Sequence, residues 1–135
     1  MSALLIRAAL EVALSGMSPS LPTAWENVAF TPTESVAWQR ATVLLAQPAN
    51  DEFGPYHREE GFLQVDLNYP LNTGAKDALT RAELIRSTFT RGASFTASGV
   101  TVHVTRTPEI MPARTEAERF VIPVRVQFHA QIQGS

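Results

Sequence analysis

Two long segments of the chain largely alternate between apolar and polar residues, which is typical of strands with two different faces. They lie at 60–70 and 119–131. Successive side chains of a strand point to opposite sides of a sheet, so each segment has one apolar face and one polar face. The apolar sets are Leu63, Val65, Leu67 and Tyr69 in the first segment and Phe120, Ile122, Val124, Val126 and Phe128 in the second. A fold that buries both sets needs a sheet covered on one side.

Two other segments repeat apolar residues at helical spacing and are expected to provide that cover. The first, 2–16, carries Arg7 and Glu11 on the side away from its apolar stripe. The second, 75–90, ends shortly before Gly92, a residue that commonly follows a helix. The two predicted stripes are Ala3, Ile6, Leu10, Ala13, Leu14 and Met17, and Ala75, Ala78, Ala82, Ile85 and Phe89.

Further extended segments complete an α-β-β-α-β-β order. Residues 36–47 are rich in β-forming side chains, and 93–104 predict a hairpin that turns at Ser98-Gly99, with its first arm a further short strand. Pro123 indicates an edge position or a bulge in the last strand. We therefore predict one α+β domain over 1–135. It has a single mostly antiparallel sheet of four to five strands, with both helices packed on one face.

Composition narrows the classes of function. Charged residues make up 18% of the chain, below the usual quarter, which favours a subunit with part of its surface covered by a partner. The net charge of −2 provides no basic field for nonspecific nucleic-acid binding. The absence of cysteine excludes disulfides and thiolate metal sites. Arg7 and Glu11 interrupt the apolar N-terminus, so we expect a soluble protein that is not exported.

Candidate chemical groups are few. Asn72-Thr73-Gly74 precedes a predicted helix, where backbone N–H groups can bind an anion. With a single glycine present, a turn is favoured, with Thr73 as the N-cap and Asp77 complementing the helix dipole. No serine-nucleophile motif occurs.

The histidines offer the main alternative to a structural role. His103, His129 and Asp66 lie on the outward, polar face of predicted strands, and they could converge on a metal or acid–base site in a small-ligand module. Outward strand positions ordinarily carry polar residues, however, and His57 lies in a predicted loop. We predict no catalytic residue, no metal and no cofactor.

Two long polar segments, 48–59 and 105–118, join these elements. The first mixes aromatic with charged side chains, a combination typical of an interface with an aromatic anchor and a charged rim. The residues predicted to form an interface are Phe53, Tyr56, Arg58 and Glu59.

Short motifs along nearly the whole chain resemble one protein family. They are Pro22-x-Ala24-x-Glu26-Asn27-x-x-Phe30-x-Pro32, then Gly61-x-x-Gln64-Val65 with Pro70 ending that strand, Gly74, Phe89-x-Arg91-Gly92 and Ile122-Pro123-Val124. This pattern is similar to the tail terminator, or tail-completion, proteins of bacteriophages with long noncontractile tails.

The resemblance implies a structural virion protein without enzymatic activity. Such a protein forms a homo-hexameric ring on the last ring of tail-tube protein, stops tube growth and provides the docking surface for the head connector. Genomic DNA passes through the channel without specific binding. The resemblance also implies a location in the neck region of the virion tail, and in the host cytoplasm during assembly. Another neck or tail-tube subunit is the alternative of the same size and class.

Overall fold

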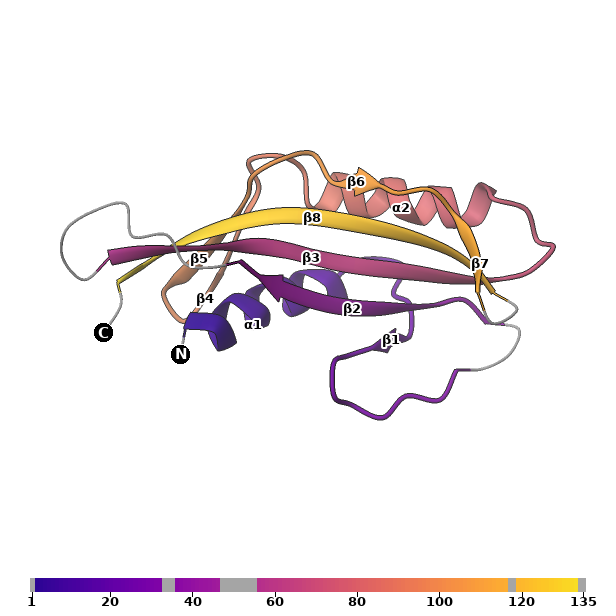
Figure 1. Cartoon of the computed structure of the whole chain (residues 1–135), viewed down its shortest axis with the longest axis horizontal. Helices are drawn as coiled ribbons and strands as arrows, with labels where there is room; N and C mark the ends of the chain where they lie inside the picture. The colour runs from indigo at the N-terminus through magenta and orange to yellow at the C-terminus, as the bar shows by residue number, and fades with distance from the viewer. Residues whose placement is uncertain (1, 33–35, 47–55, 117–118, 134–135) are drawn as a thin grey trace.

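The computed structural model describes residues 2–32, 36–46, 56–116 and 119–133 (Figure 1). The helices are α1 (Ser2–Ser15) and α2 (Lys76–Thr88). The strands are β1 (Thr23–Ala24), β2 (Trp38–Leu45), β3 (Tyr56–Pro70), β4 (Ser94–Ala97), β5 (Val100–Val104), β6 (Glu109–Ile110), β7 (Arg114–Glu116) and β8 (Arg119–Gln133). No helix among these residues is long and apolar enough to cross a membrane.

The described strands form one mixed sheet in the order β1-β2-β3-β8-β5-β4, with β6 and β7 also paired to β8. β1 pairs with β2 in parallel, and the other described pairs are antiparallel. The α+β class and the mainly antiparallel pairing agree with prediction, but the sheet has eight strands and the predicted four to five is wrong. The additional β1, β6 and β7 are two or three residues long, too short to show an alternating pattern.

The two alternating segments are the centre of the sheet. β3 and β8 pair along their whole length, from Tyr56 opposite Gln133 to Pro70 opposite Arg119. Figure 1 shows them as the two longest strands, lying side by side. Their alternate residues face one hydrophobic core, as the period of two predicts.

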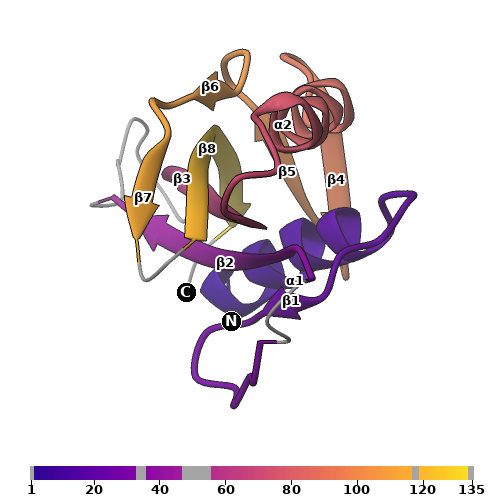
Figure 2. The ribbon, with the colours of Figure 1, turned by 90° about the vertical axis from the view of Figure 1, so that its right-hand side faces the viewer.

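Both helices bury their apolar stripes in this same core. The sheet curls, and α1 lies between β2 on one side and the β4–β5 hairpin on the other (Figure 2). The predicted contact set is confirmed, since each member is fully buried: Ile6, Leu10, Ala82, Ile85, Phe89, Leu63, Val65, Val102, Val124 and Val126. At the helix ends the predicted stripes extend too far, because Ala3 and Ala75 are exposed.

Pro123 lies within the central strand β8, so its predicted edge or bulge position is wrong. It pairs with Asp66 of β3 without interruption of the ladder. The carbonyl of Pro123 accepts a hydrogen bond from the Met111 N–H, on the side of β8 where β6 and β7 pair. A residue's nitrogen and carbonyl point to the same side of a strand, so the missing N–H of proline faces the gap between these two short strands.

Gly61 marks a close approach between β2 and β3. A Cβ atom at this position would lie 2.0 Å from the carbonyl oxygen of Leu44. This contact gives a steric reason for the glycine that opens the Gly61-x-x-Gln64-Val65 motif.

Candidate functional site

The paired ends of β3 and β8 extend beyond the strands that flank them. The β2–β3 ladder stops at Leu45 opposite Gly61, and the Ala46 N–H then donates to the Glu60 carbonyl. On the other side, the β5–β8 ladder stops at His103 opposite His129. Apart from these terminal contacts of Glu60 and His129, Tyr56–Glu60 and His129–Gln133 pair only with each other among the described strands, and we call them the strand arm (Figure 1).

One face of the strand arm is anchored in the subunit. Ala130 and Ile132 are buried and belong to the hydrophobic core. The arm is therefore held in place, while the backbone edges on its two sides have no partner strand in the described part of the chain. Such edges are the usual sites for pairing with another chain.

The predicted interface residues fall at or beside this arm. Phe53 lies outside the described residues, and Tyr56 is placed only as the first residue of β3. Arg58 forms an ion pair with Glu60, with 3.6 Å between Nε and Oε2, and Glu59 is buried. The prediction of a loop as far as residue 59 is wrong for 56–59. The mixed charges of this segment hid its pairing with β8.

The histidines and Asp66 do not converge. His103 and His129 are direct partners on neighbouring strands with ring centroids 5.2 Å apart, but Asp66 lies opposite Pro123, six residues along β8 from His129. His57, predicted in a loop, lies in β3 opposite Ile132. The three-residue centre is thus not formed, and the described residues contain no cluster of three potential metal ligands.

The histidine pair lies at the root of the strand arm. His129 Nδ1 is 3.0 Å from the Thr105 hydroxyl. Burial is the main cause that lowers the pKa of His129, and His103 and Arg58 lower it further. Glu60, which pairs with His129 on β3, has the opposite and weaker effect and raises the pKa of His129. The arrangement favours a neutral imidazole at neutral pH.

Asn72-Thr73-Gly74 is a turn, as predicted. Asn72 and Gly74 have positive φ angles of 64° and 81°. The Thr73 hydroxyl donates to the Pro70 carbonyl at 2.9 Å, and the N-cap of α2 is Ala75, without a side-chain cap. Thr73 is therefore not the predicted N-cap. Asp77 does lie in the first turn of α2.

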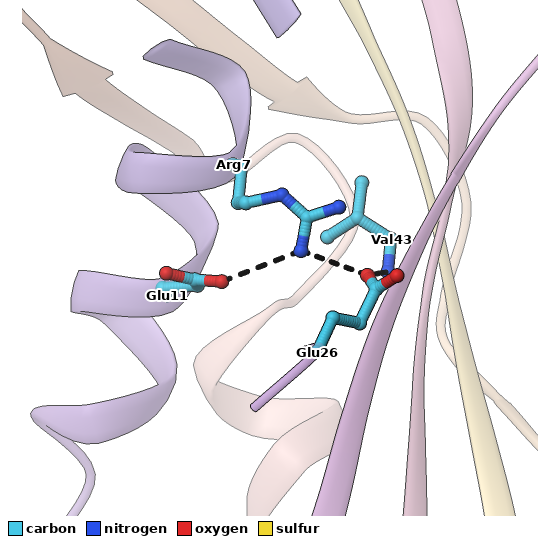
Figure 3. Close-up of polar contacts among 4 residues, drawn as sticks. All are labelled: Arg7, Glu11, Glu26 and Val43. Carbon is cyan, nitrogen blue, oxygen red and sulfur yellow. Dashed lines mark hydrogen bonds and ion pairs between the residues drawn. The ribbon is translucent and has the colours of Figure 1, made fainter. Parts of the chain in front are cut away.

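A second contact set, absent from the sequence predictions, closes the outer edge of β2 (Figure 3). Glu26 accepts hydrogen bonds from the Val43 N–H at 2.9 Å and from Arg7 at 2.7 Å. Arg7 also lies 3.6 Å from Glu11, one turn along α1. Together with the parallel pairing of β1, this carboxylate covers a strand edge that would otherwise be open.

The Val43 N–H is the main cause that lowers the pKa of the Glu26 carboxyl, and Arg7 adds to this effect against the opposing influence of burial. The Glu26-Asn27 pair of the first motif thereby acquires a structural role. Asn27 has a positive φ of 57°, which helps turn the chain after Glu26. The sequence shows only an acidic residue beside a turn-forming asparagine. The strand residue that Glu26 contacts, Val43, is 17 residues away along the chain.

The sequence profile of one family, described as phage tail terminator protein, matches residues 5–128. The chain belongs to this family. The resemblance stated from the motifs is thereby confirmed, and the protein is a structural component of the phage tail.

One solved structure shares the tail terminator chain's fold along its whole length. It has a TM-score of 0.81 and 27% sequence identity, and the alignment covers 100% of this chain and 99% of that one. Its name is a sequence identifier, which states no function. A search among curated proteins gives no match.

Proposed function

We propose that this tail terminator forms a ring that caps the tail tube, stops its polymerisation and presents a docking surface to the head connector. The observation that carries the proposal is membership of the terminator family across residues 5–128. The role is structural and needs no catalytic group. The ring is hexameric, lies in the neck region, assembles in the host cytoplasm and lets DNA pass without specific binding.

The strand arm supports self-assembly. In a ring, each subunit uses two different surfaces, and a strand pair whose edges have no partner strand among the described residues is suited to one of them. The arm carries Tyr56, Arg58 and Glu59 of the predicted interface and lies next to Phe53 in sequence. We assign these four residues to the joint between neighbouring subunits.

Tube capping provides the test. Tail-tube protein is polymerised with and without the chain, and tube lengths are measured by electron microscopy. We expect the chain to stop tube growth and to be found at tube ends. Uniform growth to the same lengths with and without the chain would refute the proposal.

The joint is tested by Phe53→Ala combined with Tyr56→Ala. We expect this variant to lose ring closure or tube capping while its circular dichroism stays unchanged. Leu79→Ala, on the exposed side of α2, is the matched control and should cap normally. If the double variant terminates tubes at normal length, the four-residue joint is wrong.

A further inference from the structure

His103 and His129 are adjacent side chains on one face of the sheet. They pair directly between β5 and β8, and their ring centroids are 5.2 Å apart. The next pair along these strands, Val104 and Phe128, is buried in the core, so the two imidazoles lie on the opposite, outer face. His103 is exposed, and a solute can therefore reach the pair from solvent.

The spacing of the two rings suits a shared metal ion. A tetrahedral ion binds imidazole nitrogens at about 2.0–2.1 Å, which places the centres of two bound rings about 5 Å apart. In the structure the rings are stacked, with 23° between their planes. Because His103 is exposed, its ring can turn about its side-chain bonds until a nitrogen of each ring faces the same point. The pairing of β5 with β8 already holds the two side chains at the required separation.

Thr105 holds the His129 ring from the side. Its hydroxyl lies 3.0 Å from His129 Nδ1. When this hydroxyl accepts a hydrogen bond from Nδ1–H, the other nitrogen, Nε2, keeps its lone pair for a metal ion. Metal-binding imidazoles are usually held in one tautomer and orientation by such a hydrogen bond at the second nitrogen.

The protonation state and the nearby charges also suit a cation. Burial is the main cause that lowers the pKa of His129, and metal ions bind only the neutral imidazole. Arg58 is a cation near the pair, but it forms an ion pair with Glu60, which lies opposite His129 on β3. The carboxylate therefore offsets the charge of Arg58 beside the two rings.

We propose that His103 and His129 form a two-histidine site for a divalent transition-metal ion of the Zn²⁺ class, with water completing the coordination. Imidazole nitrogens suit Zn²⁺, Cu²⁺ and Ni²⁺, whereas Mg²⁺ prefers oxygen ligands. Asp66 takes no part, and the prediction of no metal was made without the strand register that brings the two histidines together. The bound ion joins β5 to β8 at the root of the strand arm. This inference goes beyond the proposed function and does not depend on ring formation.

A Zn²⁺ titration of the whole chain tests the site. Binding is followed by NMR of the histidine ring protons and by thermal unfolding. We expect saturable binding that shifts the rings of His103 and His129, leaves His57 unchanged, and raises the Tm, because an ion that binds only the folded state stabilises it. Mg²⁺ at the same concentration should change neither measurement.

The histidines allow a matched control, because the chain has only three. His103→Gln and His129→Gln should each lower the affinity for Zn²⁺ at least about tenfold, since one imidazole remains in each variant. His57→Gln is the control and should bind Zn²⁺ like the parent chain. Thr105→Val removes the hydroxyl that positions His129 and should weaken binding by a smaller factor. Circular dichroism checks that every variant is folded.

Several results would overturn the site. One is the absence of saturable Zn²⁺ binding, and another is an equal loss in His57→Gln and the two site variants. Binding that survives His103→Gln unchanged shows that no ion is shared between the rings. Zn²⁺ binding should also be lost as pH falls below the ordinary histidine pKa of 6.5, because protons compete for the same nitrogens. Binding that persists at acidic pH would place the ion on carboxylates instead.

Discussion

The two helices cover the same core but differ in the faces they turn outward. α1 has only Arg7 and Glu11 as charged residues and exposes Leu4 and Val12, whereas α2 has five charged residues in 13. α2 thus has an ordinary solvated outer face, and α1 does not. Burial in the core therefore explains the apolar residues of α2 except Leu79, but those of only one side of α1.

The helices also differ in their polar ties to the rest of the fold. α1 is tied to β2 through Arg7 and Glu26, whose side chains are about one-third exposed. α2 is tied through Arg81, which is buried and donates to the Pro19 carbonyl. Burial lowers the pKa of Arg81, against a weaker opposing effect of Tyr69. The contribution of the Arg7–Glu26 ion pair to stability should depend on salt and pH, whereas that of the Arg81 hydrogen bond should not.

The largest expected effect concerns the inward faces of the two helices, which are equally buried. Leu10→Ala in α1 and Ile85→Ala in α2 each remove a fully buried side chain. We expect each to lower the free energy of unfolding by about 2–5 kcal/mol in a denaturant titration. A loss below about 0.5 kcal/mol for either would show that the helix does not pack on this core in solution.

The second largest effect is expected for the buried contact of α2, the hydrogen bond from Arg81 to the Pro19 carbonyl. Arg81→Ala should cost about 2 kcal/mol, because it removes both the packed stem and the hydrogen bond to Pro19. Arg81→Met keeps most of the stem and no longer buries a charge, so it should cost clearly less. The losses are measured by urea titration in low and high salt. Equal losses in the two variants, or a strong salt dependence, would contradict a buried tie.

The exposed tie of α1 should have a smaller effect. Glu26→Ala leaves the Val43 N–H without its acceptor, and we expect a cost of about 1 kcal/mol, limited by solvent screening. Because the folded-state pKa of Glu26 is lowered, its contribution is present above the unfolded-state pKa and is lost as pH falls through the folded-state value. Titrations from neutral to acidic pH should therefore show the variant and the parent chain converging. A constant difference would exclude a role for the charge.

The smallest effect is expected at His129. Its folded-state pKa lies below the ordinary value of 6.5, so the unfolded chain binds its proton more readily. The free energy of unfolding should decline as pH falls below that value, and His129→Gln should flatten this slope. NMR titration of the ring protons gives the pKa directly. A pKa above the ordinary value would reverse the predicted sign.

The sequence predicted those helices and strands that are long enough to show a repeating pattern of apolar residues. The alternation in β3 and β8 and the stripe containing Ile85 identified the core face correctly. The same reasoning missed β6 and β7, which are too short to have a period and form because β8 offers them an edge. It also missed the contact of Glu26 with Val43, since a hydrogen bond to a distant backbone leaves no pattern in the sequence.

The interface predicted at Phe53, Tyr56, Arg58 and Glu59 stays a prediction. The mixture of aromatic and charged residues in one segment selected Arg58 and Glu59, which lie on the strand arm. Their place in a strand was not predicted. The grouping of Asp66 with two histidines failed because alternation gives the face of a strand but not the register between strands. Only the register shows that His103 faces His129, six positions along β8 from the residue that pairs with Asp66.

Self-assembly is the central claim, and the native mass of the purified chain tests it most directly. Size-exclusion chromatography with light scattering is run on the chain alone and with tail tubes present. We predict a hexamer of the 14.8 kDa chain, either free or recovered at tube ends. A chain that remains monomeric at every concentration, and that stays monomeric and unbound when tubes are added, would contradict the account.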